Sequence, residues 1–99
     1  QPLGLVHGGV FAAIAETAAS LGASLSARTR EPGAFCVGLE NHTTFLRATR
    51  VGAELELEAR PLHAGRRTQA WSVVVRDRGR DREVALSTVR LMVVRPGEI

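Results

Sequence analysis

Lysine is absent from this sequence, so all thirteen basic residues are arginines, and the net charge is only +3. Arginine favours planar, bidentate contacts to phosphate groups. The arginines are nevertheless dispersed along the chain, and no basic tract alternates with the three phenylalanines and the single tryptophan. The composition therefore gives no support to a nucleic-acid partner, and we expect none.

Cysteine is almost absent as well. The single Cys36 excludes an internal disulfide and fits a reducing compartment. No secretory signal pattern is present, so we expect a cytoplasmic protein. The apolar stretch 3–27 is long, but its small polar residues and Glu16 at its centre argue against a membrane span. Cys36 and the three histidines lack metal-ligand spacing, so we expect no metal site.

The chain of 99 residues is predicted to form one domain over 1–99, and hydrophobic periodicity assigns its elements. One helix is predicted over 8–28, where apolar residues recur every three or four positions. Extended patterns separated by turn signals then predict four strands, at 34–47, 53–60, 69–76 and 83–94, of which 53–60 alternates clearly. The last strand is apolar on both faces and should be central. The fold class is α+β, with the helix covering an antiparallel sheet.

Glu16 is the only acid of the apolar helix. Successive helical residues turn by about 100°, which places the large side chains on one side, facing the sheet: Phe11, Ile14, Leu21 and Leu25. Glu16 lies opposite them, in a strip of small residues: Gly9, Ala12, Ala13, Ala19, Ser20 and Ala23. A solvated face would carry several charges, whereas this strip suits close approach by a second subunit. A carboxylate there is expected to be partly desolvated and poised for chemistry.

Other groups of the same helix complete a layout for acyl transfer. Ser20 follows Glu16 by one turn, and its hydroxyl could share a water or a substrate atom with the carboxylate. Gly8 and Gly9 lie at the helix N-terminus, where free N–H groups and the helix dipole favour a developing negative charge. From the residues alone two other interpretations stay open. Glu16 can be one charge on a solvated face, and the His-Gly-Gly triplet can arise by chance.

Three stretches of the sequence carry a resemblance to a known family. They are QPLGLVHGGVFAAIAETAAS, VGLENHTTFLR and ARPLHAGRRTQAW, in this order. Together they resemble the hotdog-fold acyl-CoA thioesterases of the phenylacetate-degradation type, which include the 1,4-dihydroxy-2-naphthoyl-CoA and Arthrobacter-type 4-hydroxybenzoyl-CoA thioesterases. The resemblance implies a long central helix wrapped by an antiparallel sheet. It also implies a homodimer with interfacial active sites, pairing again into a homotetramer, and N-terminal elements of the family that are missing before Gln1.

The resemblance further implies a role for each site residue. Glu16 matches the family's acid, a nucleophile or general base, and the Gly8 N–H matches the donor that polarises the thioester carbonyl. Gln1 and His7 match residues that orient the acyl group or assist its carbonyl, and Ser20 matches a hydroxyl that helps hold the hydrolytic water. The arginines expected to meet the CoA phosphates are Arg47, Arg66 and Arg67. The resemblance implies no metal and no cofactor beyond the CoA of the substrate.

The implied reaction is hydrolysis of an acyl-CoA, with an aryl or related acyl group, to a carboxylic acid and free CoA. The alternative is a non-catalytic hotdog module that binds acyl-CoA as a sensor or scaffold. Glu16 favours the enzyme, because a pure binder needs no acid at the thioester carbonyl. Elsewhere we expect Cys36 in the core, Trp71 in the core or in an interface, and His42 on a strand.

Overall fold

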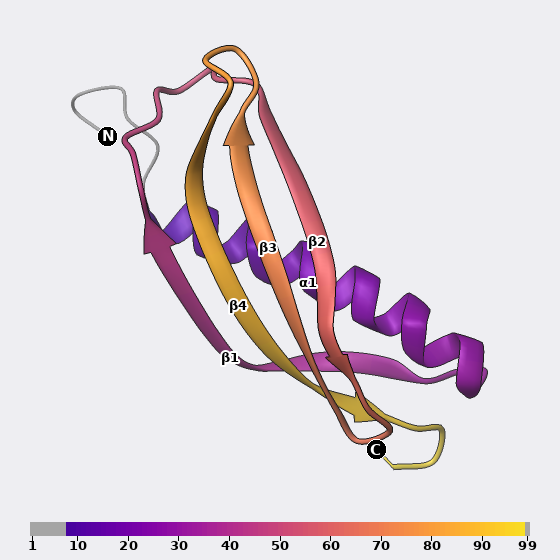
Figure 1. Cartoon of the computed structure of the whole chain (residues 1–99). Coiled ribbons are helices and arrows are strands. Elements are labelled where there is room, and N and C mark those ends of the chain that lie inside the picture. The colour runs from indigo at the N-terminus through magenta and orange to yellow at the C-terminus, as the bar shows by residue number, and fades with distance from the viewer. Residues whose placement is uncertain (1–7, 99) are drawn as a thin grey trace.

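The computed structural model describes residues 8–98, which form one helix packed across one face of a four-stranded antiparallel sheet (Figure 1). The elements, in chain order, are α1 (Gly8–Arg30), β1 (Phe35–Phe45), β2 (Leu55–Ala64), β3 (Thr68–Asp77) and β4 (Arg82–Val94). The strands lie in the order β1-β4-β3-β2. This architecture confirms the predicted α+β class, and the helix continues to Arg30 rather than ending at Arg28.

Strand β4 is central, as its apolar pattern predicts. It pairs with β1 on one side and with β3 on the other, and its inward residues Val89 and Leu91 are fully buried beneath α1. Buried and half-buried residues alternate along β3 with the period of two that a strand imposes. The core is the layer between α1 and these strands, and it contains both Trp71 and Cys36, as predicted.

The helix contacts the sheet mainly through a row of alanines spaced four residues apart. The row consists of Ala15, Ala19, Ala23 and Ala27. The prediction that Leu21 and Leu25 face the sheet is wrong, because each is 63% exposed. Residues four apart form a ridge that winds slowly around a helix, and methyl groups on that ridge let the α1 backbone approach the sheet more closely than leucines would allow.

Near its N-terminal end the helix packs through larger side chains. Phe11 is buried in a second cluster with Val75, Val84 and Ala85, and Ile14 packs against that cluster. The predicted orientation is therefore confirmed for Phe11 and Ile14. The sheet is contacted by aromatic and branched side chains at one end of α1 and by alanines along the rest.

Trp71 of β3 lies directly against the α1 backbone at Gly22. A Cβ atom placed on Gly22 would be 2.7 Å from Cζ3 and 2.9 Å from Cη2 of the indole. The indole is held in place, because its Nε1–H donates to Oε1 of buried Gln69 at 2.8 Å. Position 22 therefore has no room for a side chain while Trp71 occupies this position.

Cys36 of β1 is a small buried core residue, as predicted. Its backbone N–H donates to the Ser24 hydroxyl of α1 at 3.0 Å. Burial raises the pKa of the Cys36 thiol, because the apolar surroundings disfavour the thiolate. The side chain therefore serves packing, and the backbone ties β1 to the helix.

The segment Gly9–Arg30 is long and apolar enough to cross a membrane, with a mean hydropathy of 1.4 over an 18-residue window. The core helix of a soluble protein passes the same test of length and composition. Here one side of the helix packs on the sheet through the alanine row, and Glu16 lies near its middle. The segment is weak evidence for a membrane location.

Candidate active site

Glu16 lies near the middle of α1, against Gly38 of β1. A Cβ atom placed on Gly38 would be 3.0 Å from Cδ of Glu16 and 3.2 and 3.3 Å from its two carboxylate oxygens. The carboxylate thus occupies the space that a side chain at position 38 would need. A β-bulge follows directly, where pairing with β4 shifts between Gly38 and Glu40. Bulges are frequent beside active sites, where they re-aim side chains.

The small residues around Glu16 do not form one free face. Ala19 and Ala23 are fully buried under the sheet, because the alanine row winds through this strip. Gly9 and Ala13 are exposed, so only part of the strip is open to a second subunit. Glu16 itself is exposed, and the predicted desolvation is therefore absent from the single chain. No hydrogen bond or ion pair holds its carboxylate within residues 8–98.

The predicted oxyanion donor lies at the start of the helix that carries Glu16. Gly8 begins α1, where backbone N–H groups lack intrahelical partners. Eight residues separate Gly8 from Glu16, which is about 12 Å along a helix axis at 1.5 Å per residue. A reacting carbonyl must lie about 3 Å from both groups. The joint action of Gly8 and Glu16 on one carbonyl therefore stays a prediction.

Of the other residues predicted to lie near the thioester carbonyl, only Ser20 is among the described residues. Ser20 is half-buried and lies one turn after Glu16 on α1. Its hydroxyl has no hydrogen-bond partner in the described part of the chain, so it can bind water beside the carboxylate. Gln1 and His7 lie outside the described residues.

The three predicted arginines lie at opposite ends of the sheet. Arg47 follows β1, and its guanidinium donates to the backbone carbonyl of Glu83 at the start of β4, at 2.6 Å. Arg66 and Arg67 lie in the turn between β2 and β3, near the other end of β4. There the Arg95 guanidinium donates to the Arg66 carbonyl at 3.3 Å. A single chain therefore does not bring Arg47 together with the other two.

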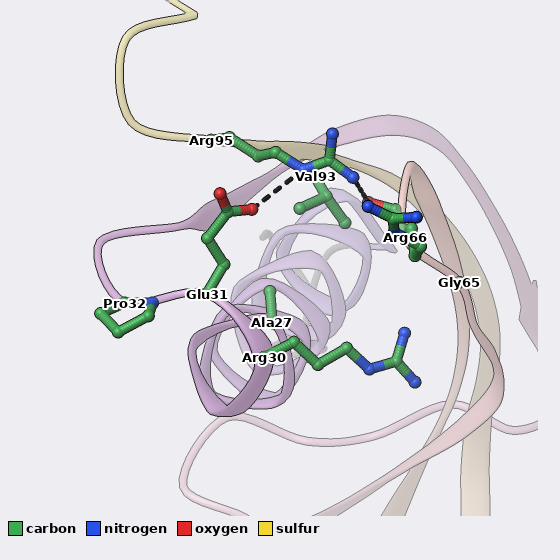
Figure 2. A pocket seen from close by; sticks show the side chains of 8 residues that line it. All are labelled: Ala27, Arg30, Glu31, Pro32, Gly65, Arg66, Val93 and Arg95. Atoms are coloured by element: carbon green, nitrogen blue, oxygen red, sulfur yellow. Dashed lines mark hydrogen bonds and ion pairs between the residues drawn. The ribbon is translucent and has the colours of Figure 1, made fainter.

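Arg66 lines a pocket of about 300 Å³ beside the C-terminal end of α1, together with Arg30 and Arg95 (Figure 2). Glu31 pairs with Arg95 at 3.0 Å. The guanidinium groups of Arg30 and Arg66 have no partner within residues 8–98. Three arginines against one glutamate leave the pocket with an excess of two positive charges. Arginines that have no carboxylate partner can bind phosphate through short, charge-assisted hydrogen bonds.

Sequence reasoning misses three residues of these sites. Arg30 and Arg95 are far apart in the chain, and only the fold places both beside Arg66. Gly38 has a recognisable signal, because a glycine inside a strand pattern marks a bulge or a close approach of another group. Both the bulge and the close approach occur at Gly38.

Comparison with known proteins identifies the family. The family model described as "Thioesterase superfamily" matches residues 3–84, which include α1 and the first three strands. This chain belongs to the thioesterase superfamily. Glu16 and Gly38 both lie within the matched part.

Relatives of this thioesterase-superfamily chain include the proofreading thioesterase EntH of Klebsiella pneumoniae, 44% identical over 77 residues, which are 78% of this chain and 53% of that protein. The solved thioesterase HI1161 of Haemophilus influenzae superposes with a TM-score of 0.85 at 36% identity, covering 96% of this chain and 63% of that one. The protein smu.793 of Streptococcus mutans, solved bound to acetyl CoA, gives 0.81 at 26% identity, covering 95% and 70%. These similarities confirm the hotdog fold.

The thioesterase-superfamily chain is shorter than its curated relatives. It spans 64% of the length of a Mycobacterium tuberculosis relative, to which it is 42% identical, and 53% of EntH. The similarity therefore covers only part of each of those proteins.

Proposed function

We propose that this chain hydrolyses acyl-CoA thioesters, with Glu16 as the nucleophile or general base. The observation that carries the proposal is the Glu16 carboxylate, exposed and unpaired within residues 8–98, in a space kept open by Gly38. EntH is named a proofreading thioesterase, and smu.793 was solved bound to acetyl CoA. As a general base, Glu16 takes a proton from the water that adds to the thioester carbonyl carbon. As a nucleophile, Glu16 itself adds to that carbon, and water then hydrolyses the resulting mixed anhydride. In both cases the carbon–sulfur bond breaks and CoA leaves as the thiol after taking up a proton.

We further propose that the active site is completed by a second copy of the chain. The axial distance of about 12 Å between Gly8 and Glu16 favours an arrangement in which the two groups that act on one carbonyl come from different subunits. The edge of β1, which no other strand within residues 8–98 pairs with, and the exposed part of the strip around Glu16 support such a contact. The homodimer pairs again into a homotetramer in this proposal. Gln1 and His7 would orient the acyl group, and Ser20 would hold the attacking water.

The acyl group is proposed to be aryl or related, because the sequence resembles the phenylacetate-degradation type. A cytoplasmic location fits the lone buried Cys36. The Glu16 carboxylate distinguishes the proposed enzyme from a hotdog module that only binds acyl-CoA. Such a module would need the CoA contacts and would not need the acid.

The function is tested by thiol release from a panel of aryl-CoA and alkyl-CoA thioesters, measured with the native-length protein. Release of CoA with turnover is the expected result, with aryl-CoA thioesters giving the highest kcat/KM. Binding of acyl-CoA without any release would instead support the non-catalytic module. Sedimentation of the same sample is expected to show no monomer at assay concentration.

Gly38→Ala is expected to lower kcat about tenfold with a small effect on stability. The added Cβ would lie 3.0 Å from Cδ of Glu16 and would displace the carboxylate, and displacement by about 1 Å can cost as much as a hundredfold in rate. Gly79→Ala is the matched control, because a Cβ there has only an ordinary contact of 3.5 Å with Asp77. Kinetics of the two variants check this, and equal kcat values for both would contradict it.

The pocket lined by Arg30, Arg66 and Arg95 is proposed to bind the phosphate groups of CoA. Arg66→Ala is expected to raise KM about tenfold, because a hydrogen bond to a charged group contributes roughly 1.5–3 kcal/mol, and 1.4 kcal/mol corresponds to about tenfold in affinity. The measurement compares an acyl-CoA with the same acyl thioester of N-acetylcysteamine, which lacks phosphate. Arg60→Ala on the other face of the sheet is the control. Equal losses on both substrates would exclude a phosphate contact.

A further inference from the structure

Two hydrogen bonds fasten α1 to β1, one on each side of the contact between Glu16 and Gly38. On one side the Asn41 Nδ2–H donates to the backbone carbonyl of Ala12 at 2.9 Å. On the other side the Cys36 N–H donates to the Ser24 hydroxyl at 3.0 Å. The helix and the strand run past each other in opposite directions, so these bonds bracket the catalytic contact along both elements.

Asn41 donates to the same carbonyl that accepts the backbone N–H of Glu16. In an α-helix the Ala12 carbonyl accepts the N–H of the residue four positions later, which is Glu16. The side chain of Asn41 therefore holds the same peptide oxygen that holds the Glu16 backbone. The Glu16 carboxylate has no hydrogen bond or ion pair of its own within residues 8–98. Its position over Gly38 is therefore set by the helix backbone that the Asn41 bond holds.

Asn41 is itself oriented by two hydroxyl groups. The Thr43 hydroxyl donates to Oδ1 of Asn41 at 2.8 Å, and the Ser87 hydroxyl lies 2.7 Å from that of Thr43. Because Thr43 gives its proton to Asn41, Ser87 is the donor in the second bond. Ser87 is fully buried in the central strand β4. The chain of bonds thus runs from the rigid middle of the sheet to the turn of α1 that carries Glu16.

We propose that Asn41 is a positioning residue for the thioesterase reaction, which fixes the turn of α1 bearing Glu16 over Gly38. This inference rests on the proposed role of Glu16. Asn41 does not touch the reacting atoms and acts through the Ala12 carbonyl. The β-bulge between Gly38 and Glu40 brings Asn41 to the inner face of β1, where it pairs in register with buried Val89.

Asn41→Asp is the sharpest test, because it keeps the size of the side chain and removes the donor. Kinetics of the native-length protein are expected to show kcat lowered ten- to thirtyfold with KM within twofold of wild type. Thr43→Val, which leaves Asn41 intact but frees its Oδ1, is expected to lower kcat three- to fivefold. Thr43→Val is also the second variant if Asn41→Asp folds poorly.

Ser24→Ala is the matched control, because it breaks the other tie between α1 and β1. If the Asn41 bond had only a structural role, Asn41→Asp and Ser24→Ala would both lose stability and would have the same kcat. The expected result is therefore a lower unfolding temperature for both and a lower kcat for Asn41→Asp only. Wild-type kcat in both Asn41→Asp and Thr43→Val, or an equal loss in Ser24→Ala, overturns the positioning role. If Glu16→Gln keeps the wild-type rate, the proposed function and this role both fail. If Glu16→Gln is inactive while Asn41→Asp and Thr43→Val both keep the wild-type kcat, this role fails alone.

Discussion

Glu16→Gln is expected to lower kcat for acyl-CoA hydrolysis at least a hundredfold while the fold stays intact. The amide has nearly the same size as the carboxylate, so it fits the space over Gly38. It can neither attack the thioester carbonyl nor accept a proton from water. General base catalysis contributes roughly 10²–10⁴ in rate, and loss of a nucleophile costs at least as much. The assay is thiol release, in which buried Cys36 adds only a constant background.

Ser20→Ala provides the comparison for this variant. It removes a hydroxyl one turn away on the same helix, and a loss of about tenfold or less is expected because water can still be held by the carboxylate. Equal rates for Glu16→Gln and wild type would refute the catalytic assignment. Single turnover in ¹⁸O-water then separates the two mechanisms. Label in the Glu16 carboxylate would show a nucleophilic Glu16, because hydrolysis of a mixed anhydride at the Glu16 carbonyl carbon places it there, whereas a general base leaves the label only in the product acid.

Trp71→Ala is expected to lower the free energy of unfolding by about 3–5 kcal/mol, the usual cost of truncating a buried aromatic residue. The indole fills the space between β3 and the α1 backbone at Gly22. Its loss also leaves the buried Oε1 of Gln69 without the indole donor. A domain of this size has a total stability of about 5–15 kcal/mol, so the variant is expected to be partly unfolded at 37 °C. Urea denaturation followed by circular dichroism measures the change.

Gly22→Ala tests the same contact from the helix side. In the wild-type protein the new methyl group would lie 2.7 Å from Trp71, and overpacking of this kind costs about 1–3 kcal/mol. In the Trp71→Ala background the clash is gone, and the higher helix propensity of alanine should stabilise the chain by about 1 kcal/mol. The sign of the effect is therefore expected to reverse. Additive effects of the two substitutions would show that the residues do not interact.

The order and type of the elements could be predicted because each has a clear period. The helix repeats its apolar residues every three to four positions, and β2 alternates leucine and alanine with glutamate along Leu55–Arg60. The central place of β4 followed from its two apolar faces. Element ends were less certain, since β2 continues to Ala64, beyond its predicted end at Arg60.

The side of the helix that faces the sheet could not be predicted from the same pattern. A helical wheel shows which residues share a side of the helix. The prediction then assumes that the side with the largest apolar residues is the buried one. In this fold close approach outweighs size, so the alanine row is buried while Leu21 and Leu25 are exposed. The contacts of Glu16 with Gly38, and of Asn41 with Ala12, join residues more than twenty positions apart. Such contacts depend on how α1 lies along β1.

The alanine row also limits how this chain can vary in length. Inserting or deleting one residue within α1 turns everything after it by about 100°. Such a change between Glu16 and Ala19 would keep Glu16 over Gly38 or keep the alanines that follow it under the sheet, but not both. The loops at 46–54 and 78–81 carry no such constraint. Among natural variants of this domain, length differences are therefore expected in loops and not in the interior of the helix.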